Sequence, residues 1–185
     1  MQKQVEEKRL YVGLDETNHG RYPEIIVAVS SFVEADANAP KLYGRHRMNE
    51  GELMRYLANE GRDFRYLKAE RGDIPKGKHQ LVEAAPYLVE QLLRALHKRG
   101  ERINSIELLL DGDMRAKELN ELHNKLFELR VKRRVKTICI DHYPKSSKRE
   151  YPYPKILIAA DSVAHFLKKG LENICAEQKL VKMVR

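Results

Sequence analysis

The stretch Leu10-Tyr11-Val12-Gly13-Leu14-Asp15-Glu16 is an apolar run that ends in two acidic residues. A second apolar, β-branched run follows over residues 24–32. The segment between the two runs, Thr17-Asn18-His19-Gly20-Arg21-Tyr22-Pro23, is rich in turn-forming residues. Because β-branched runs separated by a short turn favour paired strands, the beginning of the chain predicts an antiparallel β-hairpin.

Beyond this hairpin, helix and strand patterns alternate along the chain. Apolar residues recur at helical spacing in some segments, and short β-rich runs stand between them. The expected helices are 50–60, 79–99, 114–132 and 155–177, and the expected strands are 64–67, 105–111 and 135–141. Pro86 is expected to start or kink its helix, and Gly170 is a candidate interruption of the last one. This order predicts an α/β fold whose mixed sheet is antiparallel at its start, parallel in its later strands and flanked by helices.

The composition sets limits on the class of protein. The chain has 185 residues, of which 42% are apolar and 34% charged, and its formal net charge is +8. This length suits one compact domain, so residues 1–185 are expected to form a single unit. The chain has no apolar run of the about 20 residues that span a membrane, and its N-terminus is polar, so we expect a cytoplasmic protein without membrane association. The positive charge attracts polyanions such as nucleic acid. Cys139 and Cys175 lack metal-ligand spacing and are expected to be buried thiols.

Acidic residues stand at unusual positions in this pattern. Asp15 and Asp111 each end an apolar strand, and ligands collect at the carboxyl ends of parallel strands in open α/β sheets. Glu16 follows Asp15 where the chain turns. Asp161 lies inside the helical segment 156–167, which is apolar almost all round. A carboxylate in such surroundings needs compensation, either from a bound cation or from a buried Arg or Lys.

A cluster of these acids would repel itself without cations. Unit charges about 4 Å apart repel by roughly 4 kcal/mol at an effective dielectric constant of about 20. Oxygen ligands suit Mg²⁺ or Mn²⁺, and two such ions roughly 4 Å apart can activate water and stabilise the leaving oxygen in phosphodiester hydrolysis. The acids therefore predict a two-metal site. His165, four residues after Asp161, either exchanges a proton there or is an ordinary structural histidine.

The order of these acids resembles the ribonuclease H-like superfamily, in which a strand ends in Asp-Glu, a later strand ends in Asp and a late helix carries Asp. Tyr11-Val12-Gly13-Leu14-Asp15-Glu16 is similar to the opening Gly-Ile-Asp-Glu strand of type 2 ribonucleases H. Ala159-Ala160-Asp161-Ser162-Val163-Ala164 is similar to the acidic helix that closes many sites of the superfamily. The resemblance covers most of the chain by order of elements but only short motifs by residue. It implies that the catalytic metal ligands are Asp15, Glu16, Asp111 and Asp161, with Asp15 bridging two ions.

The sequence departs from type 2 ribonucleases H directly after the Asp-Glu pair. That family continues with Ala-Gly-Arg-Gly, which helps to recognise ribose at an RNA–DNA junction, whereas this chain continues with Thr17-Asn18-His19-Gly20. The missing ribose-sensing motif argues against a substrate defined by RNA, so an exonuclease acting on single-stranded DNA is the expected function. The alternatives are a divergent ribonuclease H that cleaves RNA or RNA/DNA hybrid, and a non-catalytic nucleic-acid-binding module. A homo-oligomer is compatible with each.

Basic residues and tyrosines are mixed in the loop before the last helix. Lys and Arg neutralise phosphates while Tyr rings stack on bases, an arrangement that holds single strands without reading their sequence. The expected nucleic-acid contacts are Lys145, Lys148, Arg149, Tyr151, Tyr153 and Lys155. The alternative is a loop whose charges are only solvated. The run Lys132-Arg133-Arg134 with Lys136 is typical of a solvated helix end, which the helix dipole favours.

Overall fold

The computed structural model describes residues 8–17, 23–38, 47–59, 61–143 and 153–170. The strands are β1 (Lys8–Glu16), β2 (Glu24–Ser31), β3 (Asp63–Ala69), β4 (Ile103–Asp111) and β5 (Thr137–Tyr143). The helices are α1 (Glu34–Ala37), α2 (Glu50–Ala58), α3 (Gln80–Lys98), α4 (Ala116–Arg133) and α5 (Lys155–Lys168). Among the helices in these ranges, none combines the length and apolar character needed to cross a membrane.

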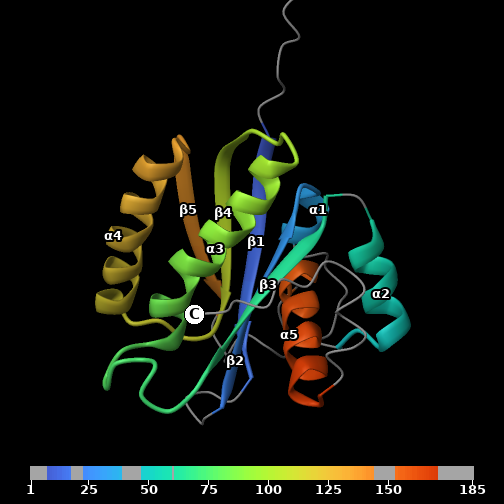
Figure 1. Cartoon of the computed structure of the whole chain (residues 1–185), viewed down its shortest axis with the longest axis horizontal. Helices are drawn as coiled ribbons and strands as arrows, with labels where there is room; N and C mark the ends of the chain where they lie inside the picture. The colour runs from blue at the N-terminus through green and yellow to red at the C-terminus, as the bar shows by residue number, and fades with distance from the viewer. Residues whose placement is uncertain (1–7, 18–22, 39–46, 60, 144–152, 171–185) are drawn as a thin grey trace, which may run out of the picture.

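The described strands form one five-stranded sheet in the order β3-β2-β1-β4-β5 (Figure 1). β1 pairs antiparallel with β2, and β2 pairs antiparallel with β3. On its other side β1 runs parallel to β4, and β4 runs parallel to β5. The predicted α/β fold, with a mixed sheet that is antiparallel at its start and parallel later, is therefore confirmed. β1 is the central strand, so its carboxyl end lies in the middle of the sheet edge.

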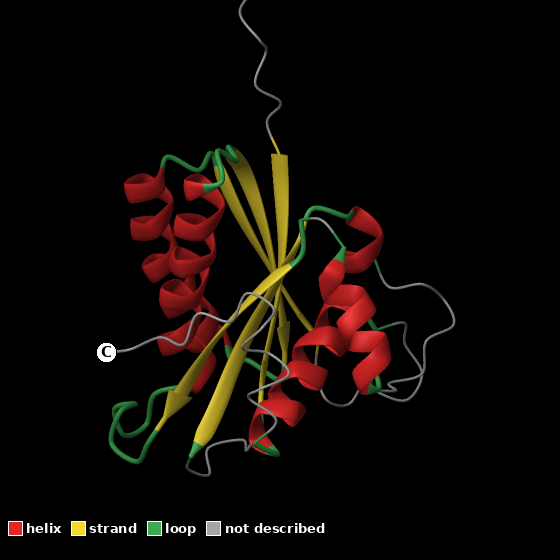
Figure 2. Ribbon diagram, turned by 45° about the vertical axis from the view of Figure 1, so that its right-hand side comes forward, coloured by secondary structure: helices red, strands yellow, loops and turns green. Residues whose placement is uncertain are grey.

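Helices cover both faces of this sheet (Figure 2). α3 lies against β1, β2 and β3, α4 lies beside α3 and contacts β5, and a core that includes Leu14, Leu88 and Leu108 fills this side. α5 packs on the opposite face against β1 and β2, over a second core that includes Val27 and Ile156. Burial of each large apolar side chain contributes about 1.5–3 kcal/mol. The central strands read as nearly continuous apolar runs because both of their faces are buried.

The edge strand β5 keeps one face open. Among the described elements, α5 packs mainly against β1 and β2 and does not cover the same face of β5. Cys139 lies on that face, opposite Glu107 of β4, and is exposed. The prediction that Cys139 is buried is wrong, because a strand pattern does not reveal which strand ends up at the edge of the sheet. Cys175 lies outside the described residues.

The predicted element boundaries agree with the structure within two residues, apart from the last helix. α1 was not predicted, because four residues are too few to show a helical period. Pro86 lies well inside α3, so it does not start that helix. α5 ends at Lys168, and Gly170 has a φ of 75°, a left-handed conformation that commonly follows a helix end. Residues 171–177 of the predicted helix lie outside the described residues.

Glu90 joins α3 to α4 through a cluster of cations. It accepts hydrogen bonds from Arg133 and Lys132 of α4 and from Arg94 on its own helix, the last two at 3.0 Å and 3.1 Å. Burial opposes the charged form of Glu90, but the hydrogen bonds from these three cations outweigh it and lower its pKa to about 2. Glu90 therefore stays ionised at pH values at which an ordinary carboxyl group takes up a proton.

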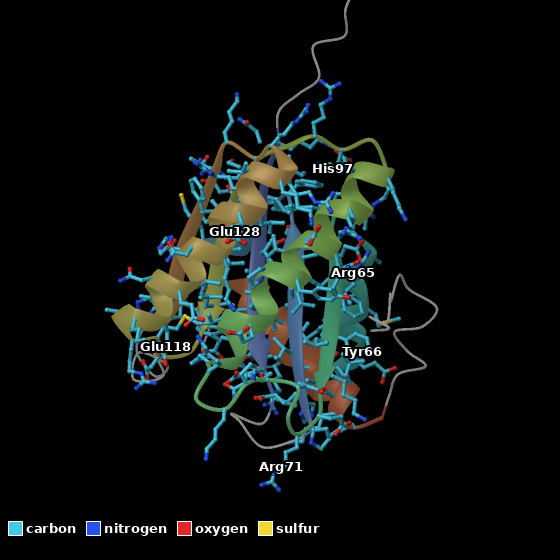
Figure 3. The ribbon with its side chains drawn as sticks, turned by 60° about the vertical axis from the view of Figure 1, so that its left-hand side comes forward. Arg65, Tyr66, Arg71, His97, Glu118 and Glu128 are labelled. Carbon is cyan, nitrogen blue, oxygen red and sulfur yellow. The ribbon has the colours of Figure 1, made fainter. Side chains whose placement is uncertain are left out.

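Glu90→Gln is expected to lower the free energy of unfolding near neutral pH by about 1 kcal/mol, the value of a partly exposed ion-pair network. Because the pKa of Glu90 lies below its ordinary value of 4.5, the stabilisation is present above pH 4.5 and is lost as the pH falls toward about 2. Urea unfolding should separate the two proteins at neutral pH and bring them together in acid. The control is Glu128→Gln, since Glu128 is exposed on α4 and forms no ion pair within the described ranges (Figure 3).

Candidate functional site

Two buried acids lie side by side at the carboxyl ends of β1 and β4. Leu14 of β1 is paired in register with Leu110 of β4, so Asp15 and Asp111 occupy the next positions on neighbouring parallel strands. Adjacent strands lie about 4.8 Å apart. Both acids are buried, with exposed fractions of 2% and 3%. The sheet thus brings these two predicted site residues together.

Both of these acids face the side of the sheet that α5 covers. A Cβ atom added at Gly13 would lie 3.0 Å from backbone atoms of Ile156 in α5, so Gly13 faces this helix, and Asp15 stands two residues further on the same face. Leu109 belongs to the core under α5, and Asp111 stands two residues beyond it. The close approach at Gly13 sets the beginning of α5 against the acid-bearing end of β1.

Gly13→Ala is expected to destabilise the protein by about 1–3 kcal/mol, because the added methyl group meets backbone atoms of Ile156 that have little freedom to move. Urea unfolding measures the loss. The matched control is Gly51→Ala in α2, where the nearest atom to an added Cβ is 3.6 Å away. That change should be neutral or stabilising, since Ala is a better helix former than Gly. Equal losses in the two variants would contradict the close packing of α5 on β1.

Asp161 is held by a basic side chain far away in the sequence. Arg47 donates from Nε to Oδ2 of Asp161 at 2.7 Å and from Nη2 to Oδ1 at 3.2 Å. The Asp161 side chain keeps an exposed fraction of 14%. The sequence left two ways to compensate this carboxylate, a bound cation or a basic side chain. The structure shows a basic side chain. The partner is not on the helix of Asp161, where the sequence offers none.

His165 completes this group on α5. Nη1 of Arg47 lies 3.1 Å from Nδ1 of His165. Burial lowers the pKa of His165, and the positive charges of Arg47 and Lys169 lower it further. The imidazole is therefore neutral at physiological pH, and its Nδ1 can accept a hydrogen bond from the guanidinium. In this arrangement His165 orients Arg47.

Backbone contacts fix Arg47 beside α5. The N–H of Met48 donates to Oγ of Ser162 at 2.9 Å, and this hydroxyl donates to the carbonyl of Ile158 at 2.7 Å. The hydrogen bond with Asp161 raises the pKa of Arg47, and the charge of Asp15 also contributes. Asp15 is thus within electrostatic range of the pair formed by Arg47 and Asp161. Sequence reasoning missed Arg47, because no spacing links it to an acid more than a hundred residues away.

Glu16 does not join Asp15 on the α5 face. It pairs in register with Ile26, whose side chain lies in the core on the α3 side, and strand alternation directs Glu16 to that side. Its backbone N–H donates to Oδ1 of Asp15 at 2.8 Å. The backbone of Glu16 therefore contacts Asp15, but strand alternation places the two carboxylates on opposite faces of the sheet.

Two further acids extend the acidic face toward the sheet edge. Asp141 of β5 is paired in register with Leu109, and Glu107 lies two residues before Leu109 on β4. Burial raises the pKa of Glu107, and the negative charge of Asp141 raises it further, against the opposing charge of Arg9. Glu107 was not singled out in the sequence, because it looks like an ordinary polar residue in a strand. The open face beside α5 thus carries acids on three neighbouring strands.

The predicted nucleic-acid contacts are only partly within the described residues. Lys145, Lys148, Arg149 and Tyr151 lie outside them. Tyr153 is buried, with an exposed fraction of 4%, and its ring packs edge-to-face on Tyr143 at 6.0 Å between centroids. The ring therefore joins the start of α5 to the end of β5, and the contact of Tyr153 with a base stays a prediction. Lys155 is exposed in the first turn of α5.

A basic groove lies between α2 and α5, next to Asp161. It has a volume of about 540 Å³, and its charged lining consists of Arg47, Arg55, Arg62 and Lys155 with a single acid, Glu52. The ring of Tyr56 lies between Arg62 and Lys155, 4.1 Å from the guanidinium carbon and 5.5 Å from the ammonium nitrogen. The exposed Arg55 forms no ion pair within the described ranges. The groove is therefore a positively charged surface that adjoins the ion pair of Arg47 and Asp161.

The donor chemistry of the sheet edge fits a hard divalent cation, because Asp15 and Asp111 offer only carboxylate oxygens. Within the part of the chain that the structure describes, no three His, Cys, Asp or Glu side chains gather closely enough to form a metal-binding group. Asp161 is turned to Arg47. A cation between Asp15 and Asp111 would therefore gain Asp161 as a ligand only after Arg47 releases it.

Sequence comparisons leave this geometry as the main guide to function. Comparison with models of protein families finds no matching family, and comparison with curated proteins finds no matching sequence. The fold, the paired acids and the basic groove are thus the features from which a function can be inferred.

Proposed function

We propose that this protein is a divalent-metal-dependent nuclease of the ribonuclease H-like superfamily. It hydrolyses phosphodiester bonds, with single-stranded DNA as the leading substrate and exonuclease action as the leading mode. The observation that supports this most is the pair of buried acids, Asp15 and Asp111, on neighbouring ends of parallel strands. Two like charges buried side by side are costly unless a cation or a proton compensates them, so the arrangement is typical of a cation site.

In this proposal Asp15 and Asp111 would hold Mg²⁺ or Mn²⁺, and Asp161 would join them when Arg47 turns away. The bound cations supply polarisation of the phosphate and a water molecule of lowered pKa. Burial of Asp15 and Asp111 fixes the direction of their carboxylates. Arg47, once released from Asp161, could use its planar guanidinium to bind two oxygens of a phosphate. The ion pair seen here would thus be exchanged for a substrate contact.

The groove between α2 and α5 supports a nucleic-acid substrate. Its exposed cations, Arg47, Arg55 and Lys155, can neutralise successive phosphates, and the groove opens beside Asp161. A strand lying in it would bring its backbone to the acid-bearing end of the sheet.

A non-catalytic nucleic-acid-binding module is the second candidate. The ion pair between Arg47 and Asp161 favours it, because this pair compensates one of the acids without a metal. Such a module would bind through charge alone, so its affinity would fall with salt and would be indifferent to Mg²⁺. A divergent ribonuclease H differs from the leading proposal only in its substrate.

Cleavage assays with end-labelled single-stranded DNA, single-stranded RNA and RNA/DNA hybrid test these candidates. Each substrate is incubated with the wild type or with Asp111→Asn, in the presence of Mn²⁺ or of EDTA. The proposal expects cleavage of DNA that requires the metal and is lost in the variant. A ladder that shortens stepwise from one end would show exonuclease action.

The other outcomes decide between the alternatives. Cleavage confined to RNA in the hybrid would assign a divergent ribonuclease H in place of the DNA exonuclease. Absence of cleavage on every substrate, together with salt-dependent binding that Asp111→Asn leaves intact, would overturn the nuclease and assign the binding module.

A further inference from the structure

A second basic cleft lies at the other end of the sheet from the carboxylates. It has a volume of about 510 Å³ and is formed by the end of α3, the beginning of β4 and the turn between α4 and β5. Its titratable lining residues among those described are all basic: His97, Arg102, Arg133, Arg134 and Lys136. The cleft therefore concentrates positive charge in a concave surface, where field lines converge on an anion.

The cleft is remote from the candidate metal centre. Ile103 lines the cleft and Asp111 ends the same strand, so about 26 Å separates them at roughly 3.3 Å per residue. Figure 3 shows His97 at one end of the molecule and Glu118, in the first turn of α4 just after β4, at the other. A small ligand bound in this cleft therefore does not contact Asp15 or Asp111.

Two of the arginines that line the cleft have no ionic partner among the described residues. Arg102 and Arg134 are exposed and form no ion pair within the described residues. Arg133 binds Glu90 through Nη2, but its Nε is buried and has no hydrogen-bond partner in the part of the chain that is described. A buried donor without a partner costs free energy.

The backbone at Arg134 gives a second, independent indication. Arg134 has a φ of 56°, in the left-handed region, at the C-cap of α4. The other described residues with positive φ are all glycines. Gly adopts this conformation without steric cost, whereas an L side chain does not. The helix dipole favours a cation near this end of α4, but it explains neither an arginine in a glycine conformation nor Arg102 beside β4.

We propose that this cleft is a phosphate-binding site, separate from the candidate metal centre. The guanidinium groups of Arg102, Arg133 and Arg134 present planar forks that match phosphate oxygens, and Lys136 adds a point charge. The phosphate belongs either to a nucleic-acid backbone or to a small phosphorylated molecule. The site goes beyond the proposed nuclease, because it needs neither the acids nor a metal.

Arg134→Gly provides the test, since it removes the charge and relieves the backbone at the same time. Binding of a fluorescent single-stranded oligonucleotide and of inorganic phosphate is measured in EDTA, which prevents metal-dependent cleavage. We expect the melting temperature to stay the same or rise. The affinity for the ligand should fall by about 5–10-fold, and the slope of log affinity against log salt concentration should become shallower by about one. The control is Arg71→Gln, an exposed arginine at the far end of the molecule that removes the same net charge (Figure 3).

The two ligands distinguish the sources of the phosphate. A loss for the oligonucleotide alone assigns the nucleic-acid backbone, and a loss for inorganic phosphate as well assigns a small phosphorylated molecule. No loss with either ligand, or an equal loss in Arg71→Gln, would overturn the site. The same measurements in the Asp111→Asn background should give the same dependence on Arg134, so failure of the nuclease proposal and failure of this site can be told apart.

Discussion

Asp15→Asn is expected to reduce metal-dependent cleavage of nucleic acid on the order of 10²–10³-fold while the fold stays intact. Asp15 ends the central strand next to Asp111, and both carboxylates are buried on the face that α5 covers. Neutralising one of them removes a charged oxygen ligand but keeps the size of the side chain. Gel assays of end-labelled DNA with Mn²⁺ measure the loss of rate.

The thermal stability of Asp15→Asn should also distinguish a metal ligand from a purely structural acid. Mg²⁺ well above its dissociation constant should stabilise the wild type by about 1–3 kcal/mol, because it binds only the folded state. Asp15→Asn should lose this response and, in EDTA, should melt at the same or a higher temperature, since the repulsion with Asp111 is gone.

Asp113→Asn is the matched control for Asp15→Asn. Asp113 lies two residues after the end of β4, but it is exposed and forms no ion pair within the described ranges. It should keep both the cleavage rate and the response to Mg²⁺. A drop in melting temperature for Asp15→Asn in EDTA, with no response of the wild type to Mg²⁺, would show that Asp15 is a structural acid.

Arg62→Met is expected to lower the free energy of unfolding by about 3–5 kcal/mol, the cost of leaving a buried charge without its partner. Arg62 donates from Nε to Oδ2 of Asp36 at 2.8 Å and from Nη2 to Oδ1 at 3.0 Å. The same carboxylate accepts from Oγ of Ser31 at 2.6 Å and from the hydroxyl of Tyr56 at 3.2 Å. These contacts join β2, α1, α2 and the beginning of β3.

The loss for Arg62→Met should appear as a fall in melting temperature of roughly 10 °C, at about 2–4 °C per kcal/mol for a chain of this size. Arg55→Met is the matched control, because Arg55 is exposed nearby on α2 and has no ion pair within the described ranges. The double change Asp36→Asn with Arg62→Met should recover part of the loss. A cost below about 1 kcal/mol for Arg62→Met would show that solvent screens the pair.

Local patterns in the sequence were enough to predict the strands, the longer helices and the mixed direction of the sheet. The alternation of apolar runs with helical periods depends on neighbours a few residues apart, so it can be read without knowing the tertiary structure. The positions of Asp15 and Asp111 at strand ends followed from the same patterns. Their meeting at neighbouring positions required that β1 and β4 pair in parallel, which the structure shows.

Several features of the site could not be predicted, because they depend on which segments meet across the fold. The pairing of Asp161 with Arg47 joins residues that no sequence spacing connects. The burial of Tyr153 depends on its packing against Tyr143, and the exposure of Cys139 depends on β5 being the edge strand. The separation of Glu16 from Asp15 depends on the pleat continuing through the strand end.

The sequence by itself thus determined the α/β class, the mixed sheet and the acids that end its central strands, because these follow from local periodicity and from strand ends. Only the tertiary structure decided that Arg47 compensates Asp161 and Arg62 compensates Asp36, and that basic side chains gather in the cleft around Arg134. Electrostatic energy depends on distance in space and on burial, and neither quantity can be obtained from separation along the chain.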